Sequence, residues 1–560
     1  MFNLSNIIYL VIAVVLSMSI HETAHGLVSY WMGDPTAKME GRLSLNPFKH
    51  VDWIGLVCLL VCGFGWAKPV PVDARYYKDA KTGIIWTSFA GPIANFLLSF
   101  ICVFLFYALY KFAPYFMMSS VGYFISNTLT YTGLISTGFG IFNLIPVPPL
   151  DGSKVLLCLF LPLFFGRTKA KEVVPIFPCT DRIENAYGVN CHLTFLQDYT
   201  RRDEELKIMN SIGINMVRGG AHSFALGYRN GKFNPLMMDS VVRSVENAKI
   251  PLHGDLSIDA FGKYFWQDYN KYIEYVDYLS SRYNKRVYNW EVINEVDLNV
   301  HTSNVAYKYV NLLKCIYPVF KKNGRQNKVL VSGLADVTKP FLDSLCHHEA
   351  YKYFDVMNLH SYESPERIPK QLETVRKVMN KYGWEKEVWL GECGMHTAPD
   401  TTKRNHWNNG KWLLEEQAHR LPRIYLIAFA YGINKVYWYE IRAGEKDLFD
   451  REQHFGLLHA NLTPKPAFLS YKTLIAKCPN LSIRPRLYVV GENYMAKWTT
   501  PKGKIVYAAW SVAPRPLNIK TEGPAKFYDL YGNKIKQPSR LSSSIVYIEN
   551  AKSVTFIPAK

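Results

Sequence analysis

The chain has 560 residues, of which 49% are hydrophobic and 20% are charged. This length predicts two or three domains, and the hydrophobic content supports a large core, which excludes disorder as the main state. Ten cysteines without CxxC or zinc-knuckle spacing exclude a disulfide scaffold. The formal net charge of +19 is spread along the chain, which favours a basic surface or an anionic membrane nearby over a nucleic-acid groove. We therefore expect no nucleic acid as a partner.

Hydropathy divides the chain near residues 166–171. Before this junction lie three long apolar runs, 7–20, 84–110 and 121–147, and a shorter run interrupted by glycines, 53–66, which is typical of a re-entrant or interfacial element. A helix needs about 20 apolar residues to cross a bilayer core. The second and third runs meet this length, and the first meets it if its helix continues through residues 21–25 to residue 31. We therefore expect an integral membrane protein with the lipid bilayer as a partner.

Ionisable residues inside the first apolar run indicate function, because they are costly within a membrane helix. They read His21-Glu22-Thr23-Ala24-His25. A helical spacing of four places both imidazoles on one face, where they can hold one Zn²⁺ ion, and Glu22 can take a proton from metal-bound water. The alternative is a pair of packing histidines beside a glutamate that reaches the interface.

A third ligand is expected outside this helix, because a catalytic zinc usually has three protein ligands and one open position. The third apolar run ends at residues 143–152, which read NLIPVPPLDG. The prolines and Gly152 break a helix at this point and allow Asp151 to point inward. The alternative for this segment alone is a turn where the chain leaves the membrane.

Together these segments resemble the site-2 protease family of intramembrane zinc metalloproteases, which has HExxH in one helix and an N-x-x-P-x-P-x-L-D-G type motif in a later one. GDPTA at 33–37, GRLSLNP at 41–47, GWAKPVPV at 65–72 and AGPIAN at 90–95 extend the resemblance over about residues 1–163. The resemblance implies hydrolysis of a peptide bond in or near the membrane, in a membrane-protein or peptide substrate. The residues that it implies are the zinc ligands His21, His25 and Asp151, the general base Glu22, and Asn95 and Asn143 for positioning the substrate backbone.

One feature departs from this family. Its members usually continue with further membrane helix after the Asp-Gly motif, whereas only residues 154–165 remain here before the soluble part begins. The ligand set is complete in the sequence, but the expected membrane domain is short.

From about residue 187, short apolar runs alternate with longer amphipathic ones. The expected strands are 188–193, 216–218, 251–256, 287–293, 356–359, 388–391 and 435–439, and the expected helices between them include 203–211, 237–248, 268–283 and 370–381. Such alternation predicts a (β/α)₈ TIM barrel. An open doubly wound sheet is the alternative, weakened because no GxGxxG follows a strand.

In such a barrel the catalytic candidates are polar residues at the C-terminal ends of the strands. Reading those ends gives Arg218, His253, Asn294, Glu295, His360, Tyr362, Glu392 and Trp438. Any one of them alone is more often a solvated loop residue. Two carboxylates from different strands, Glu295 and Glu392, match the acid and the nucleophile of a glycosidase, and an aromatic wall such as Trp438 suits stacking on sugar rings.

This constellation resembles clan A glycoside hydrolases, which include the cellulase-like family 5 and the family 39 type. WEVINE at 290–295 is similar to the strand-four Asn-Glu signature of that clan, and VWLGE at 388–392 to its strand-seven glutamate. The resemblance covers about residues 185–475 and implies a retaining hydrolase of an oligo- or polysaccharide, without a cofactor, in which Glu295 is the acid/base and Glu392 the nucleophile. The other implied roles are Asn294 at the 2-hydroxyl, Arg218 and Tyr362 in orienting Glu392, Trp438 at the −1 subsite and, more weakly, His253 and His360 in binding.

Within residues 485–560, short runs of alternating or β-branched apolar residues are separated by turns at 501–503 and 531–533. This pattern predicts a small antiparallel β domain. Packing against the barrel is favoured for it over carbohydrate binding. The expected division is therefore a membrane-embedded metalloprotease domain at 1–165, a junction at 166–184, a glycoside-hydrolase-like barrel at 185–478 and a β-sandwich-like accessory domain at 485–560.

Three interpretations of the whole chain stay open at this point. Both modules are active, or only one is, with the membrane part as an anchor or the barrel as a glycan-binding appendage, or two genes were joined artificially. We expect the protein in a bacterial plasma membrane. The side on which the barrel lies stays open, because basic residues after position 166 favour a cytoplasmic junction whereas a glycosidase for polymeric glycans suits the outside.

Overall fold

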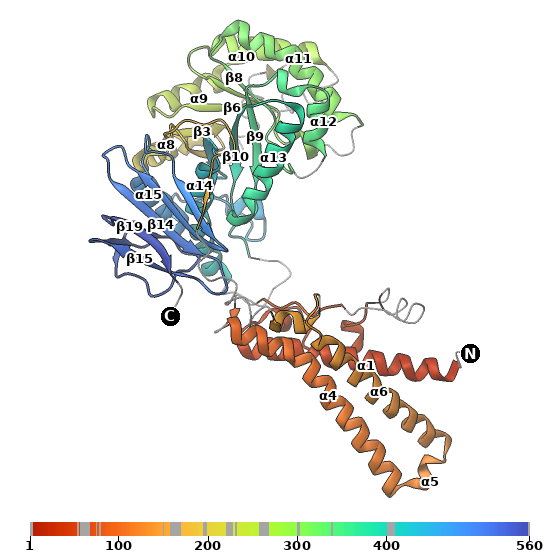
Figure 1. The fold of residues 1–560 in the computed structure, drawn as a ribbon. Coiled ribbons are helices and arrows are strands. Elements are labelled where there is room, and N and C mark those ends of the chain that lie inside the picture. Colours follow the sequence, from red (N-terminus) through yellow and green to blue (C-terminus); the bar gives the residue numbers. More distant parts are fainter. Residues whose placement is uncertain are drawn as a thin grey trace. The chain divides into compact units, whose positions relative to one another are not determined.

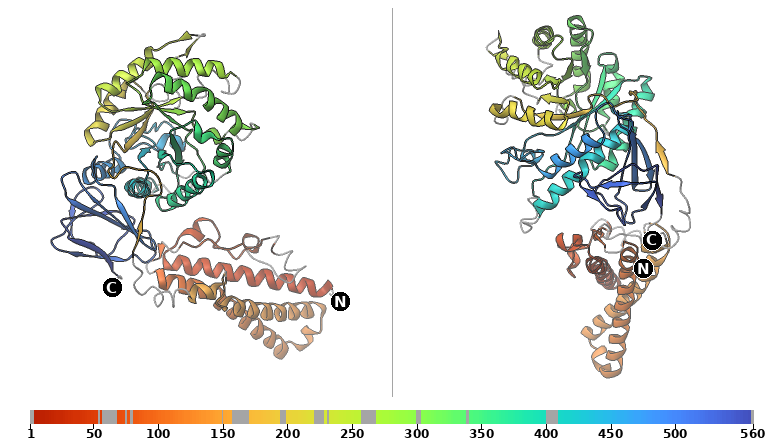
Figure 2. Two further views of the ribbon diagram at one scale, coloured as in Figure 1. Left: turned by 45° about the horizontal axis from the view of Figure 1, so that its top comes forward. Right: turned by 90° about the vertical axis from the view of Figure 1, so that its left-hand side faces the viewer.

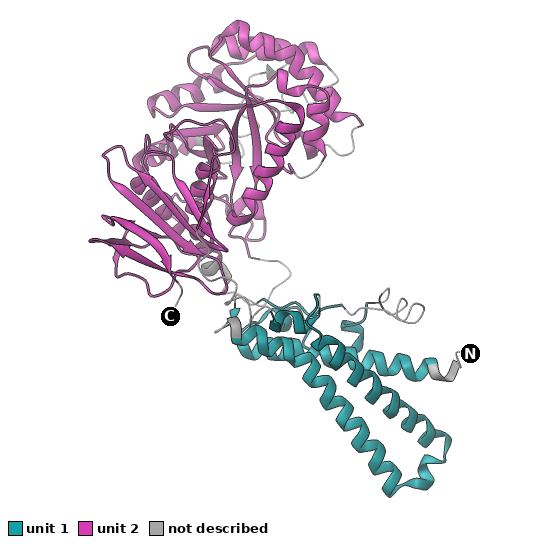
Figure 3. Ribbon diagram, viewed as in Figure 1, with its two compact units in different colours: residues 1–169 teal, residues 170–560 magenta. Residues whose placement is uncertain are grey.

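The computed structural model describes residues 4–52, 55, 68–73, 76–77, 80–148, 150–156, 170–193, 199–219, 228–229, 232–256, 268–298, 303–337, 340–399 and 409–557. The chain divides into two units, residues 1–169 and 170–560 (Figure 3). Each has its own packing and is described by itself. The apolar run 53–66 lies outside the described residues except for Gly55, and the junction at 166–171 does so up to residue 169.

In the described part of the first unit there are three long helices (Figure 1). They are α1 (Leu4–Met32), α4 (Ala80–Phe112) and α6 (Ser120–Leu144), accompanied by the short elements α2 (Thr36–Met39), η1 (Pro47–Lys49) and α5 (Pro114–Met117). The three long helices contact one another pairwise, and α5 closes the hairpin of α4 and α6. Helix α1 continues through the HExxH motif without a break, as its spanning length requires.

Two described helical stretches, Ile7–Met32 and Thr82–Phe112, are long and apolar enough to cross a membrane by length and composition. Helix α6 has the expected length, at 25 residues, but glycine, serine and threonine make it less apolar than the other two helices, so it is not among these stretches. Those small residues allow close helix packing: Ser99 of α4 donates a hydrogen bond to the carbonyl of Gly133 in α6. Large apolar side chains of α4, such as Phe100, stay exposed on the outer surface, which suits lipid.

The second unit contains a closed barrel of eight parallel strands surrounded by helices (Figure 2). In spatial order the strands are β10 (Glu387–Cys393), β11 (Lys435–Trp438), β2 (Tyr187–Cys191), β3 (Met216–Gly219), β6 (Leu252–Leu256), β7 (Asn289–Val292), β8 (Lys328–Leu330) and β9 (Val356–Ser361). The helices are α8 (Arg202–Ile212), α9 (Leu236–Asn247), α10 (Tyr269–Arg282), α11 (Val305–Asn323), α12 (Phe341–His347), α13 (Ile368–Tyr382), α14 (Asn409–Ala430) and α15 (Pro466–Lys477).

The parallel pairing of β11 with β2 closes the sheet, which confirms the predicted TIM barrel and excludes the open doubly wound alternative. The seven predicted strands each overlap an observed one. The strand that sequence analysis missed is β8, which has only three residues and follows the polar segment 324–327.

The C-terminal residues form antiparallel sheets, as predicted. A seven-stranded sheet has the order β1 (Lys171–Val173), β12 (Arg486–Val490), β13 (Asn493–Thr499), β14 (Ile505–Ser511), β18 (Val546–Glu549), β16 (Lys526–Tyr528) and β17 (Lys534–Ile535), and a second sheet pairs β15 (Asn518–Glu522) with β19 (Ser553–Ile557). Strand β1 falls within the expected junction, where it pairs antiparallel with β12. Trp498 and Trp510 of the larger sheet belong to the same buried cluster as the barrel core, so the sheet supports the barrel directly.

Candidate functional sites

The two histidines of α1 meet Asp151 in the first unit. Their Nε2 atoms lie 3.0 Å apart, and Oδ2 of Asp151 lies 3.3 Å from that of His21 and 3.0 Å from that of His25. The three ligand atoms all lie within 4.8 Å of one another, and all three residues are buried. Asp151 reaches them from the segment after α6, and its other oxygen accepts a hydrogen bond from Lys154 at 2.9 Å.

Helix α4 fixes the orientation of both imidazoles. Nδ1 of His25 donates to the carbonyl of Thr87 at 2.6 Å, which leaves the lone pair of Nε2 directed at the cluster. The amide of Asn95, which is completely buried, lies 3.1 Å from Nδ1 of His21. Gly91 gives the rings their space, because a Cβ atom there would lie 2.5 Å from atoms of both histidines. Two imidazoles and one carboxylate with their ligand atoms together fit a zinc ion.

The remaining predicted residues of the first unit lie around this cluster in different ways. Oε2 of Glu22 accepts a hydrogen bond from the backbone amide of Val70 at 2.8 Å, so the expected general base contacts the backbone of this segment. Asn143 donates its amide to the carbonyl of Phe139 in its own helix at 3.0 Å. The burial of Asn95 against His21 suits a residue that orients a ligand, whereas the sequence predicted contact with substrate.

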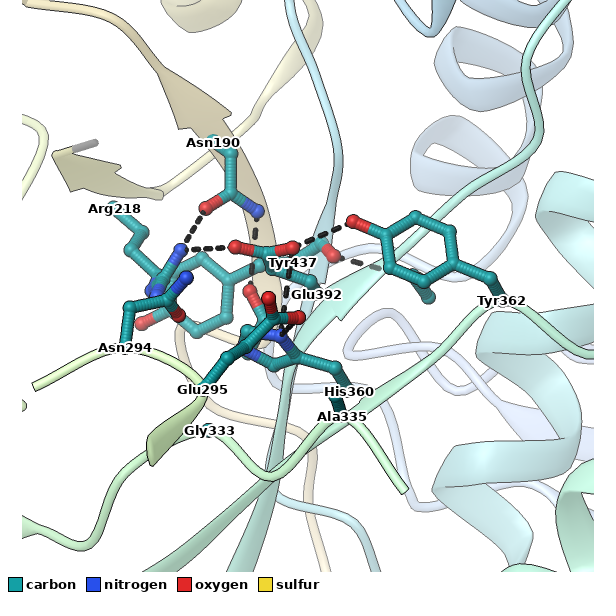
Figure 4. Close-up of polar contacts among 12 residues, drawn as sticks. Asn190, Arg218, Asn294, Glu295, Gly333, Ala335, His360, Tyr362, Glu392 and Tyr437 are labelled. Carbon is teal, nitrogen blue, oxygen red and sulfur yellow. Dashed lines mark hydrogen bonds and ion pairs between the residues drawn. The ribbon is translucent and has the colours of Figure 1, made fainter. Parts of the chain in front are cut away.

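In the second unit, most of the predicted polar residues converge at the C-terminal ends of the barrel strands (Figure 4). Arg218 of β3 is at the centre and is 2% exposed. Its Nη1 atom donates to Oε1 of Glu392 at 2.7 Å and to Oδ1 of Asn190 at 2.7 Å, and its Nη2 atom donates to Oδ1 of Asn294 at 2.8 Å. Arg218 therefore connects the ends of β2, β7 and β10.

The two predicted catalytic carboxylates face each other across His360. Nδ1 of His360 lies 2.9 Å from Oε1 of Glu295 and 3.5 Å from Oε2 of Glu392. One oxygen of each carboxylate and this ring nitrogen all lie within 4.8 Å of one another. The chain directs Glu295 inward after β7 by an unusual backbone: Ile293 has φ 67° and Glu295 has φ 47°, both in the left-handed region that β-branched and bulky residues avoid.

Neighbouring charges lower the pKa of Glu392 and raise the pKa of His360. Burial would raise the pKa of Glu392, but the charges of His360 and Arg218 and a hydrogen bond from Tyr362 at 2.5 Å outweigh it and hold the pKa below its usual value. Burial would lower the pKa of His360, but the charge of Glu392 and the bond to Glu295 raise it. Glu392 is therefore a carboxylate stabilised by cations, as a nucleophile at neutral pH requires.

A cavity of about 490 Å³ opens over these residues. Tyr362, Tyr439 and Phe455 supply an aromatic wall, with ring centroids 5.4 Å apart for both Tyr362–Phe455 and Tyr439–Phe455. His192 also lines it and is held by Glu440 at 2.9 Å. Burial lowers the pKa of His192, but this carboxylate raises it above the usual value.

Two predicted binding residues occupy other positions than expected. Trp438 is completely buried and does not line the cavity, which corrects its placement at the sugar subsite. The next residue, Tyr439, lines the cavity instead, because successive side chains of an extended strand point to opposite faces. His253 is also completely buried, with Nε2 3.2 Å from Oε2 of Glu291, so it lies beneath the cavity and not in its wall.

Sequence analysis missed Glu291, which holds Arg218 from below. Its two oxygens accept hydrogen bonds from Nε and Nη2 of Arg218 at 2.7 and 3.1 Å, and the backbone amide of Gly333 donates to Oε1 at 3.0 Å. Burial would raise the pKa of Glu291, but Arg218 and His253 lower it. The signal was present, because a glutamate between Trp290 and Val292 interrupts a buried apolar strand and needs a buried partner there.

Comparison with known proteins identifies the first unit. Residues 9–176 match the model of Peptidase family M50. The chain is also 39% identical over 154 residues to YwhC of Bacillus subtilis (strain 168), a protein named for zinc metalloprotease activity, and the match covers 28% of this chain and 70% of that protein. This chain belongs to peptidase family M50. Membership confirms the predicted resemblance to site-2 proteases and makes the chain a hydrolase by family.

The M50 unit is followed by a fold seen in glycoside hydrolases. A family 39 glycoside hydrolase from Bacteroides cellulosilyticus WH2 superposes with a TM-score of 0.54 at 19% identity, covering 67% of this chain and 82% of that one. A glucosidase from Croceicoccus marinus superposes with a TM-score of 0.50 at 12% identity, covering 70% and 100% of the two chains. At such identity the likeness establishes the fold of the second unit.

The buried pairing of Glu291 with Arg218 yields a stability prediction. The substitution Glu291→Gln removes the main counter-charge of a buried guanidinium, so we expect the free energy of unfolding to fall by about 3–5 kcal/mol. Urea denaturation of the full-length chain in detergent, followed by tryptophan fluorescence, measures this. The matched control is Glu246→Gln, because Glu246 binds Arg286 through two hydrogen bonds of 2.6 Å at the surface and its loss should cost less than about 1 kcal/mol. Equal effects of the two substitutions would contradict the role given to Glu291.

Proposed function

We propose that the chain is a membrane-bound hydrolase with two active sites, an intramembrane zinc metalloprotease in the M50 unit and a retaining glycosidase in the barrel. The observation that carries the first is the convergence of the His21, His25 and Asp151 ligand atoms within 4.8 Å. The observation that carries the second is the meeting of Glu295 and Glu392 around His360 at the C-terminal edge of the barrel. The substrates are a peptide bond in or near the bilayer and a glycosidic bond.

In the M50 unit, His21, His25 and Asp151 would hold the zinc ion. When bound, zinc supplies Lewis-acid polarisation of a carbonyl and activation of a water molecule. Glu22 lies next to His21 on α1 and is the proton acceptor closest in sequence to the ligands, so we assign it the general-base role. The carboxylate of Glu22 accepts a hydrogen bond from the backbone amide of Val70. A substrate backbone also carries amide donors, so it could make the same kind of contact at this site.

In the barrel, the close approach of the two carboxylates supports a double displacement. Retaining glycosidases have their carboxyl groups about 5 Å apart, whereas inverting ones leave room for a water molecule. Glu392 attacks the anomeric carbon while Glu295 gives its proton to the departing oxygen, which forms a glycosyl ester and breaks the glycosidic bond. Glu295 then takes a proton from water, which adds to the anomeric carbon and releases Glu392. Nδ1 of His360 lies close to both carboxylates and is placed to hold them in position relative to each other.

The aromatic wall supports a sugar ring as the substrate. The rings of Tyr362 and Tyr439 line the cavity. Arg218 holds Asn294 next to Glu295, where the amide of Asn294 can donate a hydrogen bond to a sugar hydroxyl. We assign the −1 subsite to this part of the cavity. We also propose that residues 485–560 support the barrel and that the protein is located in a bacterial plasma membrane.

The metalloprotease assignment predicts the behaviour of Glu22→Gln. Glutamine keeps the shape of the side chain but cannot accept the proton, so cleavage of a membrane-spanning substrate should fall below detection while the zinc content stays at wild-type level. Elemental analysis of the detergent-solubilised full-length chain and a gel assay of substrate cleavage measure the two quantities. Glu40→Gln, at an exposed position in the same unit, is the control. Persistent cleavage by Glu22→Gln would exclude Glu22 as the base.

The glycosidase assignment predicts the behaviour of Glu295→Ala and Glu392→Ala. Each should lower kcat/KM on an activated aryl glycoside by several orders of magnitude, whereas Glu363→Ala, at an exposed neighbour of Tyr362, should leave it near wild type. NMR of the first product should show retention of the anomeric configuration. Inversion, or full turnover in either catalytic variant, would contradict the assignment.

The lowered pKa of Glu392 predicts the acid side of the pH profile. Glu392 must be charged to attack, so activity should persist below the ordinary glutamate pKa of about 4.3 and disappear only as the pH falls through the lowered value. Tyr362→Phe removes a hydrogen bond to the carboxylate, which raises its pKa and moves the acid limb of kcat/KM up by about one pH unit. Tyr439→Phe changes the same aromatic wall and serves as the control. An acid limb that does not move in Tyr362→Phe would show that Glu392 does not govern it.

A further inference from the structure

A polar seam joins α1 and α4 in the M50 unit and continues beyond the metal ligands. Residues four apart along each helix form it, and the pairings run in opposite directions along the two helices. On α1 they are His21, His25 and Ser29, and on α4 they are Gly83, Thr87, Gly91 and Asn95. His21 meets Asn95 at one end, His25 meets Thr87 in the middle, and Ser29 is connected to Thr87 through Tyr77 at the other end.

Asp34 terminates this seam. It lies just after the end of α1 and is completely buried. Its oxygens accept hydrogen bonds from the backbone amides of Thr36 and Asp73 at 2.9 and 2.7 Å, from the hydroxyl of Thr36 at 2.5 Å and from the hydroxyl of Ser29 at 2.8 Å. Backbone amides can only donate, so both oxygens of Asp34 act as acceptors here.

The carboxylate sets the direction of every hydrogen bond that follows. Ser29 gives its one hydroxyl proton to Asp34, so Tyr77 must donate to Ser29 across their 2.9 Å contact. Tyr77 then has no proton left, and the hydroxyl of Thr87 must donate to it across 3.0 Å. The ring of Tyr77 fits against α4 only because position 83 is glycine, where a Cβ atom would lie 2.2 Å from the ring.

This chain of hydrogen bonds ends at Thr87, whose backbone carbonyl binds the predicted metal ligand His25. A threonine in a helix commonly returns its proton to the carbonyl four residues earlier, but here the proton of Thr87 is committed to Tyr77. The backbone carbonyl of the same residue accepts Nδ1–H of His25 at 2.6 Å. Only the tautomer with its proton on Nδ1 satisfies that contact, and this tautomer leaves Nε2 free to bind a cation.

We propose that Asp34, Ser29, Tyr77 and Thr87 form an outer shell of the metal site, which fixes α4 against α1 so that His25 offers Nε2 to a divalent cation. The proposal rests on the metal site of the proposed function and extends it to residues outside the ligand set. These are positioning residues, because none of them contacts the ligand atoms. Groups that orient a histidine ligand typically change metal affinity 10–100-fold when removed.

The test measures zinc binding and not catalysis. Tyr77→Phe removes the central hydroxyl and keeps the ring, and Ser29→Ala breaks the same chain one step away. For each, the zinc dissociation constant of the detergent-solubilised full-length protein is determined by competition with a chromophoric chelator. We expect it to rise about 10–100-fold in both variants. The thermal unfolding of the metal-free protein, followed by circular dichroism, shows whether a variant has simply lost its fold.

Tyr9→Phe is the matched control, because Tyr9 is a buried tyrosine of α1 whose ring packs against Phe124 and Tyr131, in contact with α6. Its zinc affinity should stay within twofold of wild type. The proposal is overturned if Tyr77→Phe and Ser29→Ala also bind zinc as tightly as wild type, or if Tyr9→Phe weakens binding to the same extent. A wild-type protein that binds no zinc would instead overturn the metalloprotease assignment itself, so the two failures give different results.

Discussion

Placing ionisable groups where water cannot reach them is the constraint on which both halves of this molecule depend. An unpaired buried charge costs several kcal/mol, so each such group needs partners that are themselves fixed. Arg218 meets this condition through Glu291, Glu392, Asn190 and Asn294 together. In the M50 unit the groups differ, but the solution is the same: Asp151 is shared between two imidazoles and a lysine.

The backbone architecture determines how such partners are collected. A parallel barrel brings the C-terminal ends of all eight strands to one edge, so that β3, β7, β9 and β10 each contribute a polar side chain without any of them being near in sequence. Two antiparallel helices achieve the same in the M50 unit with a period of four residues. There the glycines at positions 83 and 91 matter as much as the polar residues, because a side chain at either would occupy the space of Tyr77 or of the histidines.

Sequence reasoning identified the parts whose pattern is local. HExxH fixes two ligands by helical spacing alone, and seven of the eight barrel strands are long enough to show their apolar periodicity. Strand β8 was missed although two of its three residues are apolar and buried, because a run this short was not separated from the loops around it. Trp438 was placed in the cavity because it ends β11, but its side chain points to the other face of the strand and the next residue, Tyr439, lines the cavity.

Glu291, Asp34 and Tyr77 illustrate a different limit of the sequence. Each of them matters through a contact 48 or more residues away or through a chain of several hydrogen bonds, as in Ser29 with Tyr77 and Arg218 with Glu291. Spacing in the sequence predicts neighbours within one helix or strand, but not which two elements pack together. A charged residue inside an apolar strand does show that some partner must exist, and the structure is needed to say which.

The described residues of the metal site and of the barrel site come from different units of the chain. The metal cluster takes its residues from α1 and the segment after α6, with α4 orienting the imidazoles, whereas the barrel site takes its residues from β2 onwards. Among the residues that the structure describes, the side chains of each site come from its own unit. The two proposed activities would therefore be linked through the single chain that carries both sites, because a covalent connection raises the effective concentration of one site beside the other.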